Sequence, residues 1–244
     1  MLATGNNPLH TCRLSIRIST DGFSFYTYNV LDGALLQVQH AEPPATTSLQ
    51  AHLEDELRKL GALGYDFKQV DILADTPSTC VPLEHFRREE MTAVYRLTFP
   101  TSTAAYEEIH YQILPSLEVV EVFSMPEELM DTVLAVFPAA QLSCYEGARL
   151  EETAAALQGK ERDRQSLHAF IDKHSTMVCS FRAGKLVFAS TYRIQEECDR
   201  AYMILAAWKS LGMDAVRDTL HMHGAEPTLL KQLGRFVKKI ETCE

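Results

Sequence analysis

Two histidines are the first side chains in this sequence whose spacing could do chemistry. His221 and His223 lie in the run Thr219–His223, which is typical of a β-strand, and side chains two apart in a strand point to the same face. Imidazole nitrogens bind zinc, so a third ligand nearby would complete a metal site. No third ligand is visible in the sequence, and a structural or surface pair is the favoured interpretation.

The six cysteines show no pattern of metal or redox chemistry. None forms a C-x-x-C pair, which argues against a zinc knuckle and a thioredoxin-type motif. The G-x-S-x-G, H-E-x-x-H and P-loop patterns are also absent from the sequence. We therefore predict no catalytic residues and no metal site, and we expect buried, mostly inert cysteines in a reduced cytoplasmic protein.

Composition excludes some classes of partner. The chain has 244 residues, 46% of them hydrophobic, and a net charge of −10, so it can bury a sizeable core while its acidic surface repels phosphate backbones. We expect no nucleic-acid partner.

Met1–Thr11 has no basic region followed by an apolar run, and no window approaches the ~20 apolar residues of a membrane span. We expect neither a signal peptide nor a membrane span.

Two turns organise the first elements of the chain. Asp21-Gly22 and Asp32-Gly33 both tolerate positive φ, so each predicts a tight hairpin. The helix that follows, beginning near Ser48, leads into another apolar strand, which predicts a crossover and a parallel pairing in a mixed sheet. The expected strands are Arg13–Ser19, Phe23–Val30, Ala34–His40 and Val70–Ala74.

Further elements complete the first half, up to a polar stretch at Gln158–Gln165 that we interpret as a boundary. Hydrophobic spacing predicts helices and strands in this region. The expected helices are Glu84–Val94, Glu107–Leu114, Pro126–Phe137 and Glu146–Leu157, and the expected strands are Val119–Phe123 and Gln141–Tyr145.

The second half repeats the opening of the first. Three strands, a helix with Ile194, Cys198, Ala201, Leu205 and Trp208 on one stripe, and a fourth strand follow in the same order as before, which predicts an internal duplication. The expected domains are residues 1–160, with an insertion around Glu84–Glu118, and residues 165–244. The elements are strands Leu167–Asp172, Ser175–Arg182, Lys185–Tyr192 and Thr219–His223, helix Ile194–Leu211, and a last helix from Pro227 to Ile240.

Two such units resemble the actin-like ATPase fold, in which two ribonuclease-H-like domains with mixed sheets and flanking helices surround a nucleotide cleft. More closely, the chain resembles an uncharacterised family of unknown function that is assigned this fold. The matching segments are short, and their order along nearly the whole chain carries the resemblance. They are residues 20–25, Val81-Pro82, the run from Phe188 through Asp199 to Leu205, and residues 220–224.

This resemblance implies that the first hairpin of each half is a phosphate clamp, with an Asp at the strand end and a following Gly. Several places depart from that pattern: Ser19 stands in place of the Asp in the first half, and Asp172 is followed by a lysine and a histidine. On the adenosine side only Gly224 remains of the expected glycine pair. The candidate residues are Ser19, Thr20, Asp21, Gly22, Asp172, Lys173, His174, Ser175 and Gly224.

Because these motifs are degenerate, the first hypothesis is a non-catalytic scaffold or regulatory interaction module with a protein partner and no cofactor. The alternative is a divergent ATPase or sugar-kinase-like phosphotransferase that binds Mg-ATP in the interdomain cleft. A third hypothesis is an acidic adaptor that binds a small metabolite. The partner's identity and the oligomeric state do not follow from the sequence.

Overall fold

A computed structural model describes residues 12–19, 22–42, 47–62, 67–100, 107–157, 165–173, 175–194 and 196–243. The predicted boundary at Gln158–Gln165 falls almost wholly outside these residues, as does Met1–Thr11. The chain forms two compact units. The first unit comprises Met1–Ser78, His85–Gln112 and Val120–Ala148, and the second comprises Thr79–Glu84, Ile113–Val119 and Arg149–Glu244.

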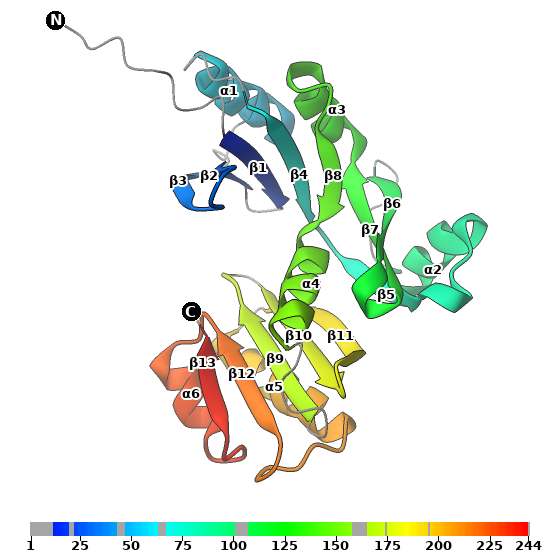
Figure 1. Ribbon diagram of the computed structural model, residues 1–244, viewed down its shortest axis with the longest axis vertical. Helices are drawn as coiled ribbons and strands as arrows, with labels where there is room; N and C mark the ends of the chain where they lie inside the picture. The colour runs from blue at the N-terminus through cyan, green and yellow to red at the C-terminus, as the bar shows by residue number, and fades with distance from the viewer. Residues whose placement is uncertain are drawn as a thin grey trace, which may run out of the picture. The chain divides into compact units, whose positions relative to one another are not determined.

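The first unit contains a five-stranded sheet in the order β3-β2-β1-β4-β8 (Figure 1). The first three strands are antiparallel neighbours, while β4 and β8 continue the sheet in parallel. The predicted meander and crossover are therefore confirmed. The strands are β1 (Cys12–Ser19), β2 (Gly22–Asn29), β3 (Leu35–Ala41), β4 (Gln69–Asp75) and β8 (Gln141–Cys144).

Alternation along β1 builds the core of this unit. Leu14, Ile16 and Ile18 are all buried on one face, as a period of two requires. They pack with leucines from α1 (Leu49–Ala62) and with apolar residues from α3 (Glu127–Val136), two helices that contact each other. The opposite face of β1 carries Arg13 and Arg17, so this sheet has an apolar side and a polar side.

The second unit contains a sheet of the same strand order, β11-β10-β9-β12-β13 (Figure 1). Here too three antiparallel strands are followed by two parallel ones. One face packs on α5 (Glu197–Ser210) and α6 (Pro227–Leu233) through a core that includes Trp208. The strands are β9 (Gln165–Ile171), β10 (Ser175–Arg182), β11 (Lys185–Arg193), β12 (Thr219–His223) and β13 (Ile240–Cys243).

A third sheet has the order β5-β7-β6. Its strands are β5 (Ser78–Pro82), β6 (Glu107–Leu114) and β7 (Val119–Pro126), and β7 runs directly into α3. A 3₁₀ turn, Pro115–Leu117, and Glu118 at φ 57° connect β6 to β7. The remaining helices are α2 (Met91–Thr98) and α4 (Tyr145–Leu157), and α4 supplies Leu150 and Ala154 to a separate apolar cluster with Phe170.

Three expectations about secondary structure are wrong. Residues 107–114 form strand β6, because pairing with β7 overrides a weak helical pattern. Leu83–His85 and Arg88–Glu90 form two short 3₁₀ turns, and a helix begins only at Met91. The last helix ends at Leu233, because the main chain beyond Gly234 turns to join β12 through the hydrogen bond from the Leu220 amide to the Lys239 carbonyl.

The expectation that the cysteines are buried holds for three of them, Cys12, Cys144 and Cys179. Cys198 is exposed, because α5 at this point has not yet reached the core that Ala201, Leu205 and Trp208 contact. None of the helices in the described residues combines the length and apolarity needed to cross a membrane.

Candidate functional site

The first hairpin closes on its own backbone. β1 ends at Ser19, whose hydroxyl donates to the carbonyl of Gly22 at 3.1 Å. Gly22 has φ 127°, in the region that favours glycine. Thr20 and Asp21 lie outside the described residues. The described part of this turn therefore presents a hydroxyl, and no carboxylate, at the end of β1.

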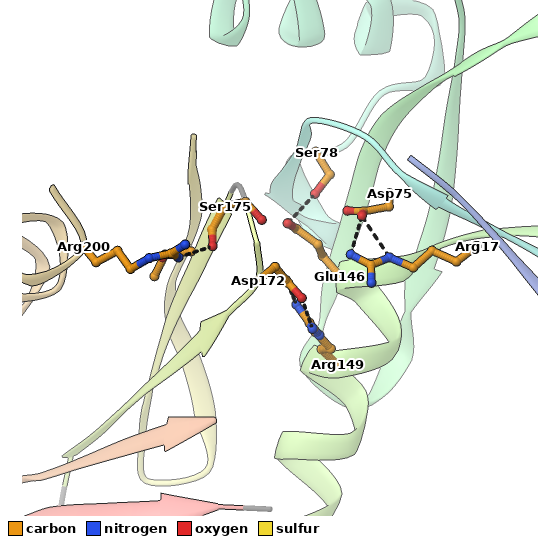
Figure 2. Close-up of polar contacts among 9 residues, drawn as sticks. Arg17, Asp75, Ser78, Glu146, Arg149, Asp172, Ser175 and Arg200 are labelled. Carbon is orange, nitrogen blue, oxygen red and sulfur yellow. Dashed lines mark hydrogen bonds and ion pairs between the residues drawn. The ribbon is translucent and has the colours of Figure 1, made fainter. Parts of the chain in front are cut away.

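A carboxylate does occur beside this hairpin, at the end of the neighbouring strand. Asp75 is the last residue of β4 and lies opposite Ser19 in the parallel register. Its Oδ2 accepts from Arg17 Nη2 at 2.5 Å and from Arg17 Nε at 2.9 Å (Figure 2). The Arg17 guanidinium also lies 4.1 Å from the ring centroid of Tyr145. The negative charge of Asp75 is thus matched by a stacked, bonded arginine.

The second hairpin holds an acid at the expected place. Asp172 follows β9, and its carboxylate forms a two-pronged ion pair with Arg149 of α4, at 2.6 Å to Nη1 and 3.0 Å to Nη2 (Figure 2). Both side chains are largely buried. The guanidinium also lies 5.1 Å from the ring centroid of Phe170. This geometry commits both carboxylate oxygens to one planar cation.

A buried arginine holds the rest of this hairpin. Arg200 of α5 donates to the carbonyl of Ser175 at 2.8 Å (Figure 2). It also donates to the carbonyl of Lys173 at 2.9 Å and to the hydroxyl of Thr176 at 2.9 Å. The Asp172 amide donates to the Ser175 carbonyl at 3.1 Å, which closes the turn. His174 lies outside the described residues, and Lys173 is exposed.

Gly224 has a structural reason to be glycine. It follows β12 with φ 73°, and a Cβ at this position would lie 3.1 Å from the carbonyl oxygen of Ile171. Both the positive φ and the close approach to the end of β9 disfavour a side chain. The structure therefore brings Gly224 beside the strand that leads to Asp172.

The first unit also contains a buried acid cluster that sequence reasoning missed. Glu121 of β7 and Glu146 of α4 are 1% and 6% exposed. The Ser78 hydroxyl lies 2.8 Å from Glu121 Oε1 and 3.1 Å from Glu146 Oε2, and Figure 2 shows the contact with Glu146. A hydroxyl has one proton and can donate to only one of these oxygens at a time. The available sign in the sequence was a glutamate inside the apolar run Val119–Phe123.

Two neighbours complete this acid cluster. Gln112 Nε2 donates to Glu121 Oε2 at 3.1 Å, while its carbonyl oxygen accepts from the Cys144 amide at 2.8 Å. Burial, followed by the two nearby glutamates, raises the pKa of the Cys144 thiol well above its usual value. Cys144 is therefore a neutral, inert thiol in this cluster.

A third histidine, His168 of β9, lies beside His221 and His223 in the structure. Nothing in the sequence indicated this proximity. The rings of His168 and His221 stack with centroids 4.4 Å apart, and His223 Nε2 lies 3.5 Å from His168 Nδ1. Nitrogen lone pairs lie in the ring plane, so stacked rings do not direct them at one point. Among the residues that the structure describes, no group of three or more histidine, cysteine or acidic side chains could hold a metal ion.

The architecture that carries these sites is the actin-like ATPase fold. A Bacteroides thetaiotaomicron VPI-5482 protein, described as having that fold and unknown function, matches with a TM-score of 0.86 and 26% identity, covering 96% of this chain and 91% of that one. The predicted fold class is therefore confirmed. The chain belongs to the family described as protein of unknown function (DUF3822), whose model matches residues 6–240.

A more distant structure with the same fold is the PilM-PilN type IV pilus biogenesis complex. Its TM-score is 0.57 at 15% identity, with 95% of this chain and 88% of that chain covered. At this identity the likeness concerns the fold alone. No curated protein sequence matches the chain significantly.

Proposed function

We propose that this chain is a non-catalytic member of the actin-like fold that acts as a scaffold or regulatory interaction module. The observation that carries the proposal is the ion pair of Asp172 with Arg149, whose two contacts are 2.6 and 3.0 Å. Asp172 stands where the phosphate-clamp pattern of actin-like ATPases has a carboxylate that helps to place the metal. Here that carboxylate is already occupied by a cation that belongs to the chain. A cytoplasmic location remains part of the proposal.

Magnesium would have to compete with this arginine. Charge-assisted hydrogen bonds contribute about 1.5–3 kcal/mol each, and Asp172 makes two of them in a largely buried pair. A metal would have to replace both, and breaking a largely buried ion pair is costly. A loss of about 3 kcal/mol in binding free energy lowers the affinity for Mg-ATP more than a hundredfold. This competition supports the absence of a functional Mg-ATP site.

The first hairpin supports the same proposal. Ser19 offers no charge, and its hydroxyl donates to the Gly22 carbonyl. A phosphate clamp needs hydroxyls and amides that point toward the ligand. The acid opposite Ser19 in the neighbouring strand, Asp75, is bonded to Arg17.

The second candidate is a divergent ATPase or phosphotransferase, and the exposed Lys173 favours it. An ammonium group at the second hairpin can bind a phosphate as a point charge without any metal. Mg-ATP binding that depends on Lys173 would fit that function.

Isothermal titration calorimetry with Mg-ATP separates the two. For the wild-type chain we expect no saturable heat up to millimolar nucleotide and no release of phosphate. Lys173→Ala and Asp172→Ala test the hairpin, and Asp131→Ala, an exposed carboxylate on α3, is the matched control. Saturable binding by the wild type that is lost in the Lys173 or Asp172 variant and kept in the Asp131 variant would overturn the non-catalytic proposal.

A further inference from the structure

Two irregular segments lie side by side at one end of the second sheet. Residues 212–218 lead into β12, and residues 234–239 lead into β13. Because β12 and β13 pair in parallel, the segments that precede them meet at the same end of the sheet. The Lys238 amide donates to the Ala215 carbonyl at 2.9 Å, which joins the two segments directly. We call them the basic turns.

The basic turns gather positive charge in a chain whose net charge is −10. They carry Arg217, Arg235, Lys238 and Lys239, and the first three of these are exposed. Lys239 Nζ lies 3.4 Å from the carbonyl oxygen of Arg217, so it adds a second link between the turns. Among the described residues, no acid forms an ion pair with Arg235 or Lys238. Their charges remain available to an anionic partner.

Two aspartates belong to the first of the basic turns, and backbone amides hold both of them. Asp214 Oδ1 accepts from the amides of Val216 and Arg217 at 2.8 and 2.9 Å. Asp218 Oδ2 accepts from the Asp214 amide at 2.7 Å. The two amide bonds are the main cause that lowers the pKa of Asp214, and the Arg217 charge adds a smaller effect of the same sign. These carboxylates are directed at the backbone of their own turn.

Each basic turn also exposes a large apolar side chain beside its cations. Val216 is 64% exposed and precedes Arg217, while Phe236 is 59% exposed and follows Arg235. Val237 is buried in the core of the second unit and anchors the turn next to Phe236. An aromatic ring and long cationic side chains on one surface suit the boundary between lipid headgroups and acyl chains. There the ring enters the apolar layer, and the ammonium or guanidinium groups reach the phosphates.

We propose that the basic turns dock on a membrane surface that contains anionic phospholipids, with Phe236 and Val216 in the interfacial layer. Charge complementarity is the argument for this partner, because each lysine or arginine near an anionic bilayer strengthens binding. The remainder of the chain is more acidic still, so this surface is the one that an anionic bilayer attracts. Such docking uses side chains of turns and requires no membrane-spanning segment.

An acidic protein segment is the other anionic partner that such a surface could meet. Peptides are commonly bound by pairing with the edge of a sheet or by laying a helix into an apolar groove. The residues of the basic turns precede β12 and β13 and belong to neither strand, so a peptide would gain no strand ladder from them. A fluid lipid surface needs no matching backbone. The exposed turn side chains therefore favour lipid.

This docking surface is separate from the second hairpin. β9 and β12 are parallel, and Asp172 follows the last residue of β9, whereas the basic turns precede β12 and β13. The hairpin and the basic turns thus lie at opposite ends of one sheet. The inference goes beyond the proposed interaction function and does not rest on it.

Co-sedimentation of the full chain with lipid vesicles is the test. The vesicles contain phosphatidylcholine alone or phosphatidylcholine with phosphatidylglycerol. The wild type should bind only the second kind, and it should do so in low salt and dissociate in high salt. Lys238→Glu and Phe236→Ser should each lower the partition coefficient by about fivefold or more. The matched controls, Lys68→Glu and Leu97→Ser, change exposed residues of the first unit and should bind as the wild type does.

Four outcomes would overturn the inference: no binding to the anionic vesicles, equal binding to both kinds, binding that survives both substitutions in the basic turns, or an equal loss in the controls. Retention on polyglutamate that requires Lys238, without any binding to vesicles, would replace the lipid by an acidic polypeptide. Circular dichroism shows whether each variant is folded. Calorimetry with Mg-ATP reads the hairpin at the other end of the sheet, so failure here and failure of the non-catalytic proposal are distinguishable.

Discussion

Acidification should destabilise the second unit through His168. This residue is buried among His221, His223 and Phe181, with Ser166 Oγ 3.2 Å from its Nε2. Burial is the main cause that lowers its pKa from 6.5 to about 3, and the two other imidazoles add to the effect. The folded protein therefore keeps His168 neutral at pH values where the unfolded chain would protonate it.

The sign and the size of this change in unfolding free energy follow from proton linkage. A histidine whose pKa is lower in the folded state contributes stability that is present above the unfolded pKa, near 6.5, and is lost as pH falls toward the folded value. Between pH 6.5 and 5 only the unfolded chain takes up the proton. This uptake lowers the free energy of unfolding by about 2 kcal/mol, at 1.36 kcal/mol per pH unit. The pKa of His223 is also lowered, chiefly by burial, so it adds loss of the same sign.

Urea unfolding at pH 7.5 and pH 5.0 measures this loss, with tryptophan fluorescence as the probe. The chain has one tryptophan, and Trp208 is buried in the core of the second unit, so its signal reports that unit. His168→Phe keeps an aromatic ring and removes the titrating group. It should reduce the pH-dependent loss by about 2 kcal/mol, whereas His85→Gln, at an exposed position, should not.

The reasoning is refuted if the wild-type free energy of unfolding is equal at the two pH values. It is also refuted if His168→Phe shows the same pH dependence as the wild type. The window stops at pH 5, because most carboxylates begin to titrate below it.

Gly147→Ala should destabilise the first unit by about 1–3 kcal/mol, because the added Cβ would lie 1.9 Å from Gln112 Nε2 and 2.2 Å from Glu121 Oε2; a melting temperature equal to that of the wild type would contradict this. In the native protein, Cys198 should react with a thiol reagent and Cys144 should not, because Cys198 is exposed and Cys144 is fully buried. The Cys198 reaction should be slower than that of a free thiol at pH 7.5, since its hydrogen bond to a neighbouring glutamate is the main cause that raises its pKa; mass spectrometry of labelled peptides checks both points.

Local patterns predicted much of the fold. The expected strand Arg13–Ser19 lies within β1, and the Asp32-Gly33 pair located a hairpin whose glycine has φ 70° in the structure. The pattern failed where tertiary pairing decides the conformation. Ile240 is the last apolar residue of the expected final helix, yet parallel pairing with β12 places it at the start of strand β13.

The sites were harder to predict, because their contacts join distant segments. Asp172 was chosen from its strand end, but its partner Arg149 lies 23 residues earlier on a helix. Arg200 lies 27 residues from Lys173, whose carbonyl it binds. Glu121 and Ser78 are 43 residues apart. The sequence alone indicates which side chains are charged. It does not indicate which of these charges pair with each other in the folded chain.

The pairing of these charges bears on what the two hairpins can bind. In the first unit the carboxylate beside the hairpin, Asp75, contacts Arg17, and in the second unit Asp172 contacts Arg149. A magnesium ion needs a carboxylate that is available to it, and a phosphate needs a cation that is available to it. An ion pair satisfies both groups and reduces the attraction of each hairpin for either kind of ligand.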